Sequence, residues 1–124
     1  MKPTITETRF GSITLEMGGK SVAYHHDVVI RPSGKVQKRK KKLSKQVYGT
    51  SHTISLAEAN HIYQEGAEML LIGTGAFGMV KLSDEAAGFF EEKGVEVESQ
   101  PTAEAAQVWN ELQGAVIGLF HVTC

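Results

Sequence analysis

Cysteine is nearly absent from the sequence: of 124 residues only Cys124 carries a thiol, so no disulfide can form within the chain. A chain without disulfides suits a reducing compartment, and we expect a cytoplasmic protein. Long hydrophobic runs are missing too, because no stretch approaches the roughly 20 apolar residues of a membrane span. Residues 1–7 lack the apolar core of a signal peptide, so we expect neither export nor membrane insertion.

The composition also lacks the bias that keeps a chain unfolded. Hydrophobic residues make up 41% of the sequence and charged residues 22%, which is the balance of an ordinary globular protein. A length of 124 residues lies within the usual size of one domain and is long enough to close a hydrophobic core. We therefore expect residues 1–124 to form a single domain.

The net charge of −1 conceals a strong asymmetry along the chain. Residues 1–57 hold eleven Lys and Arg against three Asp and Glu, whereas residues 58–124 hold two against eleven. Seven of the thirteen basic side chains fall within residues 35–45. Such a division predicts a directed electrostatic surface.

The first half of the chain has the pattern of short strands separated by turns. Residues 5–10 and 12–17 alternate apolar and polar side chains with a period near two, and Gly18-Gly19 is a hairpin signal. We expect an antiparallel meander there. Residues 38–46 show no periodicity, so we expect an exposed edge strand or loop from which only Leu43 reaches a core.

After Ser55 the pattern changes to helices that alternate with apolar strands. We expect three helices, each with an apolar stripe at helical spacing. The first covers about residues 55–65, and the other two begin near Ser83 and Thr102. Ser55 and Glu58 have the spacing of a capping box, in which each side chain accepts an unpaired backbone N–H. The apolar runs 69–72 and 115–120 are typical of strands covered on both faces.

This alternation predicts βαβ units, and hence a partly parallel sheet with right-handed crossovers. We therefore predict an α/β (α+β) fold of three layers. A central mixed sheet has helices on one face, and the N-terminal meander forms a smaller antiparallel sheet on the other.

Several segments resemble one known domain family. They are Phe10-Gly11, residues 27–30, Gly49-Thr50-Ser51-His52, residues 71–75, Thr102 with Ala105 and Asn110, and His121-Val122-Thr123-Cys124. The family includes the adipogenesis-associated domain-containing protein of animals, a mitochondrial complex I assembly factor, and stand-alone archaeal and bacterial proteins. The resemblance implies a mixed sheet between helices and a smaller antiparallel sheet. It implies no enzymatic activity that could be carried over to this chain.

Residues 73–78, with the sequence Gly-Thr-Gly-Ala-Phe-Gly, match the dinucleotide-binding fingerprint, and Glu98 lies where a ribose-binding carboxylate would follow. In that fingerprint the helix begins inside the glycine motif, whereas here the first good N-cap is Ser83. The spacing therefore favours a tight turn over a nucleotide site. The exposed N–H groups that could still hold a small anion there belong to Gly73, Thr74, Gly75 and Ala76.

The strongest functional signal is a basic cluster, which comprises Lys38, Arg39, Lys40, Lys41 and Lys42. These side chains could bind the phosphates of a nucleic acid in a salt-dependent way. Only one aromatic residue, Tyr48, lies nearby, so the stacking platform of single-strand binders is missing. An acidic protein partner and a solvated edge that discourages aggregation are the other interpretations.

The histidines and the cysteine have the chemistry of a reactive site but form no complete set. His52 could act as a base or bind a ligand, yet the sequence supplies no third group to orient it. His25 and His26, as neighbours in a strand, point to opposite faces and cannot readily chelate one ion. With Asp27 and His121 included there is still no ligand quartet, and we expect Cys124 to be a small side chain that ends a buried strand, so we predict no metal, no cofactor and no catalytic residue.

The sequence favours a non-enzymatic protein-binding or assembly module that docks a protein partner through the basic cluster and the rim near residues 73–75. The first alternative is a small-anion or metabolite-binding protein, with a pocket near His52 and residues 73–76. The second is nucleic-acid binding through residues 38–42. We expect no membrane partner, and a homo-oligomer remains an open alternative.

Overall fold

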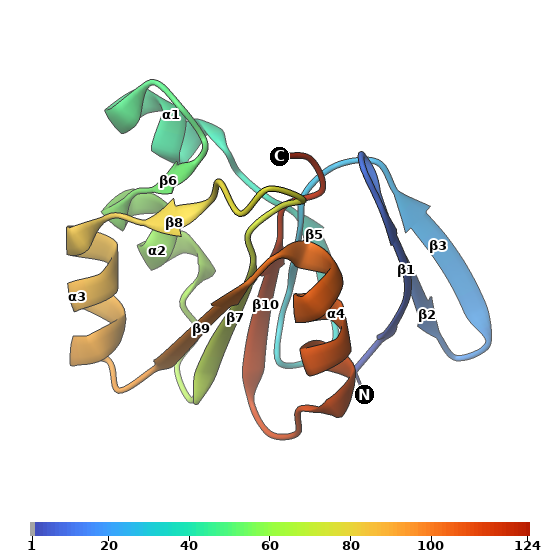
Figure 1. Ribbon diagram of the computed structural model, residues 1–124. Helices are drawn as coiled ribbons and strands as arrows, with labels where there is room; N and C mark the ends of the chain where they lie inside the picture. Colours follow the sequence, from blue (N-terminus) through green and yellow to red (C-terminus); the bar gives the residue numbers. More distant parts are fainter. Residues whose placement is uncertain (1) are drawn as a thin grey trace.

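The computed structural model describes residues 2–124 and has a central sheet covered on both faces (Figure 1). The elements in this part of the chain are, in order, β1 (Thr4–Arg9), β2 (Ser12–Met17), β3 (Lys20–Tyr24), β4 (Val28–Ile30), β5 (Val36–Lys38), α1 (Lys42–Tyr48), β6 (Thr53–Ile54), α2 (Leu56–Ile62), β7 (Met69–Gly73), β8 (Lys81–Leu82), α3 (Asp84–Glu92), β9 (Glu96–Gln100), α4 (Thr102–Glu111) and β10 (Val116–Phe120). None of these helices has the length and apolar character that crossing a membrane requires.

The central sheet has the strand order β5-β4-β10-β7-β9. Strands β10, β7 and β9 run parallel, whereas β4 is antiparallel to both β10 and β5. Strands β6 and β8 form a separate short parallel pair. The predicted mixed sheet and the predicted fold class are therefore confirmed.

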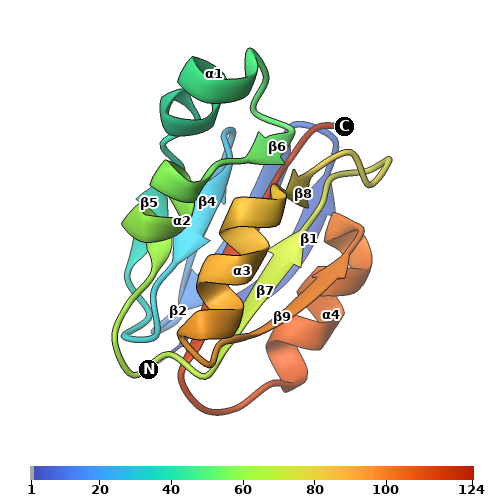
Figure 2. The same cartoon turned by 90° about the vertical axis from the view of Figure 1, so that its left-hand side faces the viewer.

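The two faces of the central sheet bury separate hydrophobic clusters. On one face, α2 and α3 pack through Ile62 and Phe90 against the sheet, and Figure 2 looks onto this face. On the other face, Trp109 of α4 and Ile13 of β2 pack against Phe120 of β10. Helix α4 thus shares its face with the three-stranded sheet β1-β2-β3, whereas we expected all helices on the opposite face.

The path of the chain explains the position of α4. After β7 the chain moves outward through α3 to the edge strand β9, and then returns past β7 to β10 through α4. Both connections join parallel strands but lead in opposite directions along the sheet. Because such crossovers are right-handed, the two helices must lie on opposite faces.

The N-terminal meander forms as predicted. Strands β1, β2 and β3 pair antiparallel in sequence order. Gly18 and Gly19 both have positive φ, 59° and 80°, which matches the hairpin turn that glycine favours. Asn110 of α4 ties the meander to the rest of the fold, because its side chain hydrogen-bonds both the N–H and the carbonyl of Ile5.

Our expectation for residues 38–46 is wrong in two respects. The segment does not stay extended, because α1 begins at Lys42 and ends at Tyr48, where Gly49 with a φ of 71° forms a left-handed C-cap. It also carries buried polar side chains, Arg39 and Ser44, while Leu43 is only half-buried. A helix that turns one serine inward leaves no apolar stripe, so the sequence pattern could not reveal it.

Helix α2 is shorter than predicted, and its capping box is only half formed. The Ser55 hydroxyl accepts the N–H of Glu58 at 3.1 Å, as expected. The Glu58 carboxylate does not return to the N–H of Ser55, which donates instead to the Ser44 hydroxyl. The helix ends at Ile62 because Tyr63 is already extended, with ψ of 141°.

Candidate functional site

The strand registers place the ends of five strands in one row. Gly73 of β7 lies opposite Phe120 of β10, which in turn lies opposite Val28 of β4. Gln100 of β9 and Lys38 of β5 extend the row to both edges. The ends of these strands lie at one end of the sheet (Figure 1). The residues immediately beyond this row are Asp27, Arg39, Thr74, Pro101 and His121.

Asp27 is the centre of the buried polar network at this end. Its carboxylate accepts hydrogen bonds from Nδ1 of His121 at 2.7 Å, from the N–H of Val122 at 2.9 Å and from Nη1 of Arg39 at 3.0 Å. Burial raises the pKa of Asp27, but the His121 and Val122 hydrogen bonds and the charges of His121 and Lys41 outweigh it and hold the pKa at about 2. Asp27 is therefore ionised and can only accept, so Nδ1 of His121 carries a proton.

Arg39 links Asp27 to a second buried carboxylate, Glu58. Its Nε and Nη2 donate to the two oxygens of Glu58 at 2.6 and 3.0 Å, and Nη2 also donates to the Ser51 carbonyl at 2.6 Å. Burial lowers the pKa of Arg39, but the two carboxylates outweigh it and raise the pKa above the ordinary value. The Ser44 hydroxyl completes the coordination of Glu58. Arg39 is thus an internal ion-pair partner, not the exposed partner-binding residue that we predicted.

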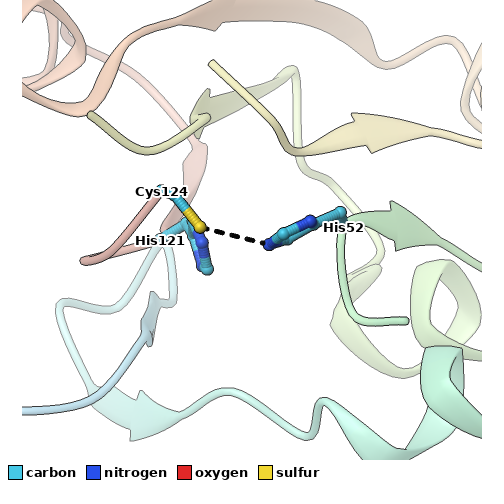
Figure 3. A group of neighbouring side chains, drawn as sticks. All are labelled: His52, His121 and Cys124. Carbon is cyan, nitrogen blue, oxygen red and sulfur yellow. Dashed lines mark hydrogen bonds between the residues drawn. The ribbon is translucent and has the colours of Figure 1, made fainter. Parts of the chain in front are cut away.

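His52, His121 and Cys124 form a second cluster next to this network (Figure 3). The sulfur of Cys124 lies 3.7 Å from Nε2 of His52, and one ligand atom from each residue lies within 4.8 Å of the others. The two imidazole rings meet edge to face, with centroids 5.5 Å apart. His121 is buried, whereas His52 and Cys124 are half-buried and border solvent.

The glycine motif after β7 contacts the protein itself. The N–H groups of residues 74–76 all donate hydrogen bonds of 2.8–2.9 Å within the protein. Their acceptors are, in order, the Gln100 carbonyl, the Thr102 hydroxyl and the Thr123 carbonyl. The prediction that these amides are exposed and hold an anion is therefore wrong. A tight turn follows β7, and the next helix, α3, begins only at Asp84. No helix therefore starts inside the glycine motif, as a dinucleotide fingerprint requires.

Close packing explains why positions 73 and 75 are glycines. Gly75 has a φ of +101°, and a Cβ on it would lie 2.5 Å from the carbonyl carbon of Cys124 and 2.7 Å from Cδ2 of His121. A Cβ on Gly73 would lie 2.8 Å from the ring of Phe120. The two glycines let the segment that follows β10 lie directly against the segment that follows β7.

An open pocket of about 640 Å³ lies beside the buried network, and we call it the basic pocket. Basic or protonatable side chains dominate its lining, and they are His25, His26, Lys38, Lys40, Lys41 and Lys42. Asp27, Arg39, Val122 and Thr123 complete it. Neither His52 nor residues 73–76 line this pocket. Ala76 borders a different pocket of about 120 Å³ next to Phe10.

Residues 5–120 match a family described as a protein of unknown function (DUF498/DUF598). The chain belongs to the DUF498/DUF598 family. A conserved hypothetical protein from Pyrococcus horikoshii OT3 is 37% identical, with a TM-score of 0.87 over 98% of this chain and 99% of that one. The protein MT938 is 29% identical, with a TM-score of 0.80 over 99% and 100% of the two chains.

A Mth938-like domain from Bordetella pertussis shares the fold with this DUF498/DUF598 protein. The two are 19% identical and superimpose with a TM-score of 0.62 over 97% of this chain and 85% of the other. At that identity the likeness concerns the fold alone.

Sequence reasoning named His52, His121 and Cys124 separately but did not bring them together. It used Asp27 only in the family resemblance and as a possible metal ligand, and Glu58 only as a helix cap, and it did not predict that both carboxylates are almost fully buried. A usable signal was present: Asp27 directly precedes one apolar strand, and His121 directly follows another. Only the antiparallel pairing of those strands places the two residues at the same end of the sheet.

Proposed function

We propose that this DUF498/DUF598 protein is a non-enzymatic binding module that docks an acidic segment of a protein partner in the basic pocket. One observation carries the proposal: four lysines and two histidines line a single open pocket. Its volume of about 640 Å³ lies within the usual range of ligand pockets, so the charge of its lining, not its size, supports an acidic ligand. A partner with several carboxylates could meet several of these cations at once.

The charge balance inside the pocket supports an acidic ligand. Arg39 is already neutralised by Asp27 and Glu58. Of the four pocket lysines, only Lys41 has a carboxylate within 4.0 Å in residues 2–124, at 3.6 Å from Asp27. The other three lysines therefore add an uncompensated positive field, which attracts and orients an acidic partner.

Two further features support a protein ligand over a nucleic acid or a small anion. No Phe, Tyr or Trp lines the basic pocket, so bases would find only the small imidazole rings of His25 and His26 to stack on. The amides of residues 74–76, which we expected to hold a small anion, are bonded to protein atoms. The resemblance to the adipogenesis-associated domain-containing protein and to a complex I assembly factor supports a role in assembly. A single cysteine suits a reducing compartment such as the cytoplasm.

Fluorescence anisotropy with a labelled oligoglutamate peptide tests the proposal. The test variant replaces Lys38, Lys40 and Lys42 with Ala and leaves the Asp27 partner Lys41 intact. Losing three exposed ion contacts worth about 0.5 kcal/mol each weakens binding roughly tenfold. The matched control replaces three exposed lysines that do not line the pocket, and they are Lys20, Lys35 and Lys45.

The control variant should bind the peptide as the wild type does. It loses the same net charge as the test variant, but the lining of the pocket is unchanged. Equal weakening in both variants would mean that binding follows total charge, and would contradict docking in the pocket. Preference for a single-stranded oligonucleotide over oligoglutamate at the same salt concentration would favour the nucleic-acid alternative instead.

A further inference from the structure

We propose that His52, His121 and Cys124 form a zinc site in which two imidazole nitrogens and one thiolate are the protein ligands. Zinc in proteins is bound by these side-chain types, and three protein ligands leave a fourth position for water or another donor. The three residues come from two distant segments, the loop before β6 and the segment after β10 (Figure 3). Neither His52 nor Cys124 lines the basic pocket, so the site is independent of the function proposed above.

The distances between the three side chains fit a tetrahedral ion. Zn–N bonds of about 2.0 Å and Zn–S bonds of about 2.3 Å place neighbouring ligand atoms about 3.3–3.6 Å apart. The sulfur of Cys124 and Nε2 of His52 are already 3.7 Å apart. All three ligand atoms lie within 4.8 Å of one another, so side-chain shifts of about 1 Å complete the site.

The buried network prepares His121 as a ligand. Nδ1 of His121 donates to the ionised Asp27, which leaves Nε2 as the nitrogen that binds the ion once any proton on it has passed to solvent. A carboxylate that holds the other ring nitrogen is the usual outer partner of a zinc-bound histidine, because it orients the ring and increases its basicity. At present Nε2 faces the Thr123 hydroxyl at 3.2 Å, a contact that the metal would replace.

The backbone also holds Cys124 in place. The N–H of Met79 donates to the Cys124 carbonyl at 3.2 Å, and the N–H of Ala76 donates to the Thr123 carbonyl at 2.8 Å. Gly75, which has no side chain, lets this segment pack beside His121. The backbone of Cys124 is therefore held near both histidines before any ion arrives, which lowers the cost of ordering the site.

The charges around the site also suit a divalent cation. Asp27, Glu58 and Arg39 together carry a net charge of −1. Cys124 binds as a thiolate and releases its proton to solvent, which adds one negative charge next to the cation. Lys41, whose side chain is 36% exposed, lies at the border of this group and is partly screened by water.

Zinc and cobalt titrations of protein stripped with a chelator test the proposal. Calorimetry should show one equivalent of Zn²⁺ bound, and Co²⁺ should give a thiolate-to-cobalt charge-transfer band. Cys124→Ser should abolish that band, and both Cys124→Ser and His52→Ala should weaken zinc binding at least tenfold. His61→Ala, which removes an exposed histidine outside the cluster, is the matched control and should bind like the wild type.

Circular dichroism establishes that each variant is folded, and His52→Gln replaces His52→Ala if the latter unfolds. Absence of zinc binding by the wild type would overturn the proposal, and so would zinc binding of equal strength in Cys124→Ser. Rapid alkylation of Cys124 by iodoacetamide in a wild type that binds no zinc would also overturn it, and would indicate a nucleophilic thiol beside the Asp27–His121 pair instead.

Discussion

Replacing Arg39 with Met should destabilise the protein more than any other single change among its basic residues. Arg39 is 3% exposed and is the cation between the buried carboxylates Asp27 and Glu58. Met fills a similar volume but leaves both carboxylates without their partner. Removing one partner of a buried ion pair costs about 3–5 kcal/mol, because the remaining charge is buried away from water without a counter-charge. With an unfolding entropy of about 2.1 cal/mol/K per residue, this loss lowers Tm by roughly 10–20 °C in a chain of this length.

Urea denaturation followed by circular dichroism measures the unfolding free energy directly. Lys40→Met is the matched control, because Lys40 is the exposed neighbour of Arg39 and its replacement should change the free energy by no more than about 0.5 kcal/mol. Arg39→Lys should give an intermediate loss, since one ammonium cannot reproduce the paired bonds to Glu58. If Arg39→Met costs less than about 1 kcal/mol, the ion pairs do not contribute to stability in the way we describe.

Two further predictions concern the same end of the sheet. The pKa of Asp27 lies at about 2 in the folded protein against an ordinary value of 3.8, so its contribution is complete above about pH 4. That contribution, about 2 kcal/mol, should be lost as the pH falls from 4 toward 2, which urea denaturation at stepped pH measures; a flat profile over this range would contradict the Asp27 network. Gly75→Ala should destabilise the protein by at least about 1–3 kcal/mol, because its φ of +101° and the 2.5 Å approach to Cys124 exclude a Cβ. Gly88→Ala, in α3 with nothing within 4 Å of its Cβ position, should instead stabilise by about 0.5–1 kcal/mol, and thermal unfolding of the two variants compares them.

Local signals identified most of the elements. Ser83 caps α3 as its sequence pattern indicated, accepting the N–H of Ala86 at 3.1 Å. Gly18-Gly19 forms the expected hairpin turn, and the apolar runs became the buried strands β7 and β10. These features depend on residues close together in the sequence, so periodicity and capping chemistry are enough to find them.

The candidate site, in contrast, depends on residues that are far apart in the sequence. Arg39 was interpreted as part of an exposed cluster because its neighbours are lysines, and nothing near it indicated that its partners are Asp27 and Glu58, 12 and 19 residues away. Likewise, His52 and Cys124 are 72 residues apart. Their proximity depends on the order of strands in the sheet, which no local pattern encodes.

Hydrophobic periodicity, turn glycines and helix caps were therefore sufficient to set the three-layer class and most element positions, since each reflects the local preference of the backbone. The face on which α4 packs, the burial of Arg39 and the meeting of His52, His121 and Cys124 were decided only when the strands paired. Strand order and register place residues that are distant in the chain within a few ångströms of each other, and burial then determines which charges must find partners.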